Sequence, residues 1–335
     1  MISSRFGDMS RQLMFGRQNL HLKTLITTLS EQMTTGKAVD VARHLHGNMS
    51  VLAGIEASLT QVKARSYVAQ NASTILGAQQ SVIGDLSATA DKILDDLLRT
   101  DLVSDEAARS RRLAEIHDAF SQGIRQLNMT VAGRSLFAGS ASEGPAIAAP
   151  DVILSALLAE LPPLADPYDL SEFVDAWFAP GSGFDAQGYM GSGRTQEPFE
   201  LGHGIFARID ITAQDHALRR YLASLAKGAL FHEAMSGADH PEKRAMLNIV
   251  VSDLTITGAA MTDLAARLGM EEGNAALGAS RAEAEQTTLM IARADLVAVD
   301  PYEAASQLEQ TMSQLEMIYT LTSRLSRLSL ADYLR

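Results

Sequence analysis

Cysteine is absent from the 335 residues, which excludes disulfide frameworks, thiolate metal sites and thiol catalysis. Basic residues are also few: 28 Lys and Arg face 40 Asp and Glu, for a formal net charge of −12. Nucleic acids and anionic lipid surfaces are bound through clustered Lys and Arg, so this balance argues against both as main partners. We therefore expect no nucleic-acid binding.

Long uninterrupted apolar runs are missing as well. The longest, such as VILSALL from Val152, fall well short of the roughly 18 to 20 residues that a membrane-spanning helix needs. Charges at Arg5, Asp8, Arg11 and Arg17 leave no room for the apolar segment of a secretory signal peptide. We expect no membrane insertion, and export, if it occurs, without a cleaved N-terminal signal.

Proline, glycine and aromatic residues are unevenly distributed. No proline occurs between residues 1 and 144, whereas residues 138–238 hold seven of the nine prolines, eleven of the 24 glycines and ten of the eighteen aromatics. The same segment has 13 acidic and 5 basic residues, and so carries −8 of the net charge. These shifts predict a separate, solvent-facing module in the middle of the chain.

Both flanks of this segment show the apolar period of α-helices. Apolar residues recur every three or four positions in several stripes, among them Leu22, Ile26, Leu29 and Met33; Val82, Leu86, Ala90, Ile93 and Leu97; and Leu308, Met312, Leu315, Ile318 and Leu321. Stripes this long and narrow predict coiled-coil packing.

We therefore predict a mainly α fold, a long coiled-coil-like helical rod formed by both chain ends with a small α+β insertion domain in the middle. Residues 1–36 and 300–335 are expected to be terminal helices of an inner coiled-coil layer. We expect them to be disordered in the monomer, because each exposes a seam that only neighbouring subunits can cover. Residues 37–137 and 239–299 should form a helical inner domain, and residues 138–238 the outward-facing insertion.

The insertion is expected to contain one β-hairpin that turns near Gly202 to Gly204. Apolar and polar residues alternate from Ile205 to Thr212, which is the period of a half-buried strand. The next helix should begin at Asp215, a suitable N-cap. A separate aromatic core is expected from Phe173, Trp177, Phe178 and Phe206.

The sequence offers no convincing catalytic or metal-binding constellation. His44 and His46 lack a third ligand nearby. Ser224 and Lys227 have the Ser-x-x-Lys spacing of some serine acyl enzymes, but the companion Ser-Asp-Asn and Lys-Thr-Gly motifs are missing. The Gly-rich stretch that ends at Gly193 fails as a nucleotide-binding loop, because a third glycine is missing from the pattern. We expect no enzyme activity, no metal and no cofactor.

Three segments are similar to a known family: TTGKAVD (Thr34 to Asp40), GRSLFAGS (Gly133 to Ser140) and LSLADYLR (Leu328 to Arg335). They resemble segments of the flagellin superfamily, and within it those of the hook-associated proteins at the hook-filament junction. The resemblance covers both flanks. It implies a structural subunit of the bacterial flagellum that joins hook to filament by axial polymerisation through its terminal helices.

The resemblance also implies a location and partners. Family members leave the cell unfolded through the flagellar type III channel, so we expect an extracellular protein. Its partners would be a neighbouring hook-associated protein, flagellin, further copies of the chain in a ring or tubular layer, and an export chaperone. Flagellin itself is the near alternative, and a cytoplasmic coiled-coil adaptor is another.

The subunit interface is expected on the apolar residues of the two terminal helices. These residues are Phe6, Leu13, Leu20, Leu22, Ile26 and Leu29 near the N-terminus, and Leu315, Ile318, Leu321, Leu325, Leu328 and Leu334 near the C-terminus.

Overall fold

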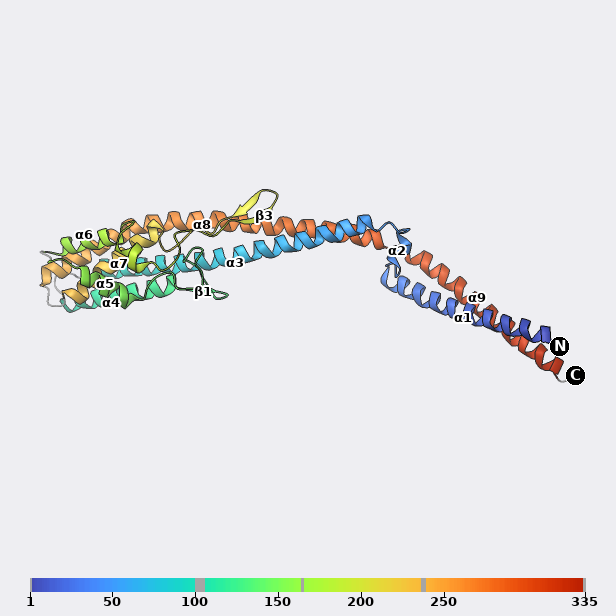
Figure 1. Cartoon of the computed structure of the whole chain (residues 1–335). Coiled ribbons are helices and arrows are strands. Elements are labelled where there is room, and N and C mark those ends of the chain that lie inside the picture. Colours follow the sequence, from blue (N-terminus) through green and yellow to red (C-terminus); the bar gives the residue numbers. More distant parts are fainter. Residues whose placement is uncertain (1, 100–105, 164–165, 236–238, 334–335) are drawn as a thin grey trace. The chain divides into compact units, whose positions relative to one another are not determined.

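A computed structural model describes residues 2–99, 106–163, 166–235 and 239–333 (Figure 1), with the backbone alone for residues 2–12, 240 and 325–333. The helices are α1 (Ile2–Thr35), α2 (Val41–His44), α3 (Ser50–Arg99), α4 (Glu106–Leu127), α5 (Pro150–Glu160), α6 (Pro167–Phe178), α7 (His216–Ala234), α8 (His240–Val297) and α9 (Pro301–Tyr333), with a π-helical turn at Phe184–Gly188. The strands are β1 (Thr130–Val131), β2 (Arg134–Ser135), β3 (Phe199–Gly202) and β4 (Ile205–Ala207).

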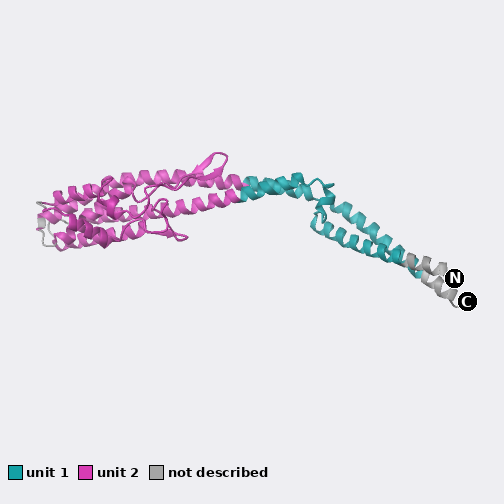
Figure 2. Ribbon diagram, viewed as in Figure 1, with its two compact units in different colours: residues 1–63, 284–335 teal, residues 64–283 magenta. Residues whose placement is uncertain are grey.

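The described residues form a mainly α fold with two small antiparallel sheets, β1–β2 and β3–β4, which confirms the predicted fold class. The chain divides into two compact units (Figure 2). Unit 1 comprises residues 1–63 and 284–335, and unit 2 comprises residues 64–283. The boundaries of these two units differ from those of the three-part division expected from composition. Which of the three parts can fold alone remains a prediction.

In unit 1, α1 packs against α9. The buried and half-buried side chains of this contact follow a spacing of four and three on both helices: Phe15, Asn19, Leu22, Ile26 and Leu29 on α1, and Ala304, Leu308, Thr311, Leu315 and Ile318 on α9. This is the heptad spacing of a coiled coil. Asn19 and Lys23 of α1 hydrogen-bond to Tyr319 of α9 and lower the pKa of its phenol.

The segment that follows α1 pairs with the segment between α8 and α9. Gly36 adopts the left-handed conformation with φ of 66°, and its amide donates to the Gln32 carbonyl at 2.8 Å, as at many helix C-termini. The chain then runs antiparallel to the residues after α8. The Ala38 amide donates to the Val297 carbonyl at 2.9 Å, and the Val299 amide to the Gly36 carbonyl at 3.0 Å.

Unit 2 has a continuous core to which α3, α4, α5, α6, α7 and α8 all contribute. Helix α7 is its most buried element, with fourteen buried residues from Ala217 to Phe231. Helix α4 approaches it closely, because a Cβ at Gly228 would stand 2.6 Å from the Ile116 side chain. Residues 138–238 therefore share a core with both flanks.

The middle segment contains the predicted β3–β4 hairpin, with positive φ at Gly202, His203 and Gly204. Asp215 caps α7 as expected, since its carboxylate accepts from the Ala217 amide at 3.0 Å. The expected separate aromatic core is wrong in two respects: its rings belong to the shared core of unit 2, and Phe206 is not part of it. Trp177 and Phe178 pack with Phe184, whereas Phe206 is 45% exposed on the hairpin because it occupies the outward position of a short strand.

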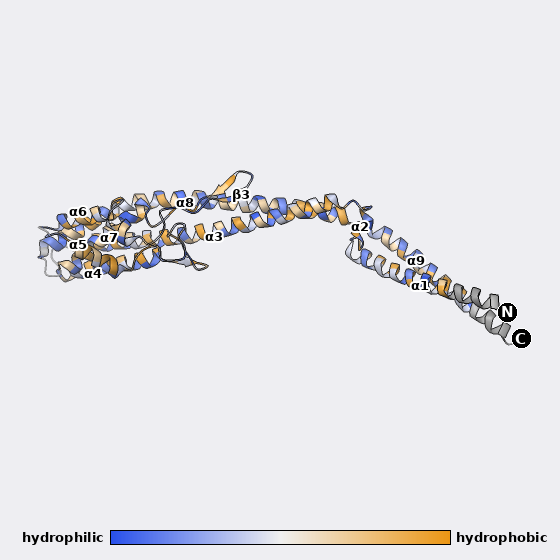
Figure 3. Ribbon diagram, viewed as in Figure 1, coloured by the Kyte–Doolittle hydropathy of each residue, from blue (hydrophilic) through white to orange (hydrophobic). Residues whose placement is uncertain are grey.

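By length and composition, α8 is apolar enough to cross a membrane, with a mean hydropathy of 1.3 over an 18-residue window. Only 33% of this window is buried, yet Met261, Leu264 and Leu268 of α8 belong to the core of unit 2. Polar residues interrupt the apolar ones along the helix (Figure 3), so no uninterrupted run marks it in the sequence. Core helices of soluble proteins have the same property.

Candidate assembly interface

The outer faces of α1 and α9 carry large apolar side chains that the coiled-coil seam does not cover. On α1, Leu13 is 62% exposed and Leu20 68%. On α9, Met312 is 50% exposed, Met317 62% and Leu321 45%. We call these five residues the outer apolar residues. Burial of each of them against another subunit would be favourable.

The structure divides the predicted interface residues into three sets. Leu22, Ile26, Leu29, Leu315 and Ile318 lie in the seam between α1 and α9 of one chain. Leu13, Leu20 and Leu321 are exposed. The remaining four, Phe6, Leu325, Leu328 and Leu334, lie outside the residues whose side chains the structure describes.

The sequence prediction missed Met312 and Met317 as exposed residues. The apolar stripe of the last helix includes Met312, so the sequence does not show that this residue is exposed. Met317 lies outside the stripe, and nothing in the neighbouring sequence marks it as an interface residue. The heptad register of α9 places the polar residue Thr311 in the seam with α1, and the same register leaves Met312 and Met317 outside the seam. A register that counts Thr311 as a seam residue would have identified both.

Charge differs sharply between the units. Unit 1 contains eleven basic and eleven acidic residues, so the whole net charge of −12 lies in unit 2. Electrostatic repulsion between copies is consequently weaker between two copies of unit 1 than between two copies of unit 2. The outer apolar residues therefore stand on the part of the chain with no net charge.

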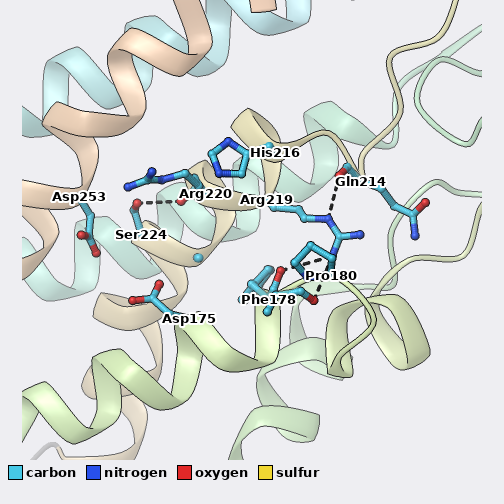
Figure 4. A pocket seen from close by; sticks show the side chains of 11 residues that line it. Asp175, Phe178, Pro180, Gln214, His216, Arg219, Arg220, Ser224 and Asp253 are labelled. Atoms are coloured by element: carbon cyan, nitrogen blue, oxygen red, sulfur yellow. Dashed lines mark hydrogen bonds between the residues drawn. The ribbon is translucent and has the colours of Figure 1, made fainter.

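Unit 2 contains a cavity of about 540 Å³ between α6, α7 and α8 (Figure 4). Its lining residues are Asp175, Phe178, Ala179, Pro180, Gln214, His216, Arg219, Arg220, Ala223, Ser224 and Asp253. Ser224, the serine of the Ser-x-x-Lys pattern, donates to the Arg220 carbonyl at 2.7 Å. Lys227 is 2% exposed and its Nζ donates to Asp175 at 2.7 Å and to Asp253 at 2.5 Å.

The Ser224 hydroxyl and the Lys227 amine thus each have other partners, and the geometry gives no support to acyl transfer by this pair. Proton abstraction from a serine requires a free amine within hydrogen-bond reach of the hydroxyl. Instead Lys227 links α7 to α6 and α8 through two carboxylates. Its role here is to hold three helices together.

A second charged cluster in unit 2 is also structural. Arg219 is 7% exposed, pairs with Asp185 and lies over the Phe184 ring at 5.1 Å from its centroid. Burial raises the pKa of Asp185, but hydrogen bonds from the Gly181 amide, Arg219 and Gln214 outweigh it, so the net pKa lies below its usual 3.8. The cluster fixes the loop after α6 against the start of α7.

Within the residues that the structure describes, no group of three or more His, Asp or Glu side chains is arranged to hold a metal ion. His44 ends α2 and His46 follows it with a positive φ, and both are exposed.

Comparison with known proteins gives a limited result. No protein-family model and no curated protein matches the chain. Among solved structures, a protein from Vibrio parahaemolyticus assigned as flagellar hook-associated is similar over 73% of this chain and 95% of its own, with a TM-score of 0.49 and 15% identity. At this level of similarity it shows neither a family nor a function.

Proposed function

We propose that the chain is a structural subunit of the bacterial flagellum, that it assembles through α1 and α9, and that it joins hook to filament. The observation that carries this proposal is the exposure of Leu13 and Leu20 on a helix that already uses its other face for the seam with α9. The three family-like segments, TTGKAVD, GRSLFAGS and LSLADYLR, supply the flagellar context.

The energetics support an intermolecular role for these helices. Two helices that share one seam gain little beyond the entropy lost in ordering them. Full burial of a Leu side chain contributes about 1.5 to 3 kcal/mol, so covering Leu13 and Leu20 with neighbouring copies adds several kcal/mol per subunit. A tubular layer of copies would supply this cover and leave the acidic unit 2 to solvent.

The test is a strain that lacks this chain. We expect electron microscopy to show hooks without filaments, and the wild-type chain supplied in trans to restore the filaments. A Leu20→Glu/Met317→Glu variant should be exported into the medium but should not restore them. Normal filaments with this variant as the only copy would contradict assembly through the terminal helices.

Gold-labelled antibody distinguishes the proposed junction from its alternatives. Label confined to a narrow zone at the distal end of the hook supports the junction role. Label along the entire filament would identify a flagellin instead. Label restricted to the cytosol, with normal flagella in the deletion strain, would identify an adaptor and overturn the flagellar proposal.

A further inference from the structure

Helix α6 lies in a stretch that contains no basic residue at all. From residue 135 to residue 193 there are eight Asp and Glu and neither Lys nor Arg. The apolar side of α6 packs into unit 2, through Leu170, Val174, Trp177 and Phe178. Its opposite side exposes Tyr168, Asp169, Glu172 and Asp175. We call this side the acidic face of α6.

Tyr168 and Glu172 are the members of the acidic face that the fold itself does not use. Asp169 takes part in the capping box with Asp166, and Asp175 pairs with Lys227. Tyr168 is 65% exposed. The exposed Glu172 carboxylate has no hydrogen bond or ion pair with any residue that the structure describes. Because they are four positions apart on a helix, their side chains are neighbours on the surface.

Unit 1 offers a surface of the opposite kind. A groove of about 600 Å³ lies between the beginning of α3 and the end of α8. Leu59 and Val297 are buried along it, and Met290 is 46% exposed. We call it the basic groove, because the exposed Lys37 and Lys63 line it.

Two of the three positive charges of the basic groove are not compensated by any residue that the structure describes. Arg293 is paired with Glu56, with 3.3 Å between Nε and Oε1. Lys37 and Lys63 have no ion pair with a described residue. The groove therefore presents two positive charges beside apolar side chains, in a protein with a net charge of −12.

We propose that the basic groove receives the acidic face of α6 from a second copy of this chain. The Tyr168 ring lies against Met290 and Leu59, and the Glu172 carboxylate pairs with Lys63 or Lys37. The inference rests on the proposed function, to which it adds a contact between unit 1 of one subunit and unit 2 of the next. An unrelated basic protein would cover α6 alone, whereas a second copy uses both surfaces.

This contact joins two different surfaces, so it is heterologous and repeats from copy to copy until a ring closes or a filament grows. Two variants test this contact, and each of them removes one of its two sides. Lys37→Glu/Lys63→Glu removes the groove and keeps α6, and Tyr168→Ser/Glu172→Gln removes the acidic face and keeps the groove. All chains carry Leu20→Glu, which separates this contact from that of the terminal helices.

Sedimentation velocity of the purified full chains gives the readout. We expect the Leu20→Glu chain to self-associate and each variant alone to be monomeric, with a dissociation constant raised on the order of tenfold or more. An equimolar mixture of the two variants should form a one-to-one dimer. The control changes, Asp263→Asn and Lys92→Glu, neutralise one acidic and reverse one basic side chain at exposed positions elsewhere in unit 2 and should leave self-association unchanged.

A monomeric Leu20→Glu chain, or a mixture that stays monomeric, overturns the inference. So does self-association of either variant to the level of the parent chain. Cross-linking provides a second test that needs no charge reversal, because the chain has no cysteine. Copies with Lys63→Cys, mixed with copies carrying Glu172→Cys, should be joined by a short thiol cross-linker, and copies with Asp263→Cys should not.

The two proposals fail separately. If the groove contact is absent while Leu20→Glu/Met317→Glu still prevents filament growth, the terminal-helix interface stands and this inference falls. If the groove contact forms but the deletion strain has normal flagella, the copies associate in some other assembly, and the flagellar proposal falls.

Discussion

Helix α7 of unit 2 and helix α1 of unit 1 both carry apolar residues at helical spacing, yet they bury them to very different extents. Fourteen residues of α7 are buried, because α4, α5 and α6 all pack around it. Of the α1 side chains that the structure describes, Leu22 and Leu29 are buried, and Leu13 and Leu20 are largely exposed. Helix α7 packs against three helices of the same chain, whereas α1 packs against α9.

This difference explains why similar apolar periods give different outcomes. An apolar stripe is buried where several helices supply side chains for it, and a core of this kind stabilises a unit cooperatively. A stripe that meets one partner helix leaves its remaining apolar flank exposed, and that flank becomes an interaction surface. The apolar period alone does not reveal which case applies.

The largest effect is expected for Phe120→Ala in the core of unit 2. The Phe120 side chain is fully buried on α4, so its removal should cost about 3 to 5 kcal/mol of unfolding free energy. The single tryptophan, Trp177, is 4% exposed in the same core and reports this loss by fluorescence in urea. Leu29→Ala in the unit 1 seam is the matched change and should leave the Trp177 transition within about 0.5 kcal/mol. Equal losses would show that the two units unfold as one.

Asp185→Asn should have the next largest effect, about 1.5 to 3 kcal/mol, because it removes a charged partner from the buried Arg219. The pKa of Asp185 is lower in the folded protein than its usual 3.8, so its carboxylate stabilises the fold above that pH. The contribution is lost as the pH falls through the folded-state pKa. The unfolding free energy should be measured with urea at a series of pH values from 6 downward. Below about pH 4 it should fall less for Asp185→Asn than for the wild type. Parallel curves would mean that the ion pair does not stabilise unit 2.

Several elements of both units could be predicted from the sequence. The helical flanks, the β3–β4 hairpin and the Asp215 cap follow from apolar period, glycine placement and capping preference, which are local signals. The outward position of Phe206 follows from the alternation between Ile205 and Thr212, which the predicted aromatic core did not take into account. The shared core of residues 138–238 depends on long-range packing, which composition does not encode. For the same reason the sequence grouped Leu22 with Leu20 as interface residues, although the structure buries the first and exposes the second.

A smaller effect is expected where α7 meets α4. In Gly228→Ala the new Cβ would meet the Ile116 side chain at 2.6 Å, so we expect a loss of about 1 to 2 kcal/mol from overpacking, less the gain in helix propensity. Gly269→Ala on α8 is the control, because no atom lies within 4 Å of its Cβ position. It should stabilise unit 2 by up to about 1 kcal/mol. Thermal unfolding of the two variants should therefore shift in opposite directions, and a shift in the same direction would mean that α7 and α4 are packed loosely.

The smallest effect on the isolated chain is expected for Leu20→Glu, on the exposed flank of α1. Leu20 is 68% exposed, so the substitution removes little intramolecular packing and should change the unfolding free energy by no more than about 0.5 kcal/mol. In an assembly the same side chain would be covered, and a carboxylate there would be buried without a partner at a cost of several kcal/mol. Leu22→Glu, two positions along the same helix, places the same charge in the α1–α9 seam, where Leu22 is 5% exposed. If the α1–α9 seam is already formed in the monomer, circular dichroism should show lost helix for Leu22→Glu and none for Leu20→Glu; if the chain ends are disordered in the monomer, as the sequence predicts, the two spectra should not differ. Filament growth in the deletion strain should fail with both. If Leu20→Glu supports filaments and Leu22→Glu does not, the exposed flank of α1 is not an assembly surface and the two units differ only in how firmly each one is packed.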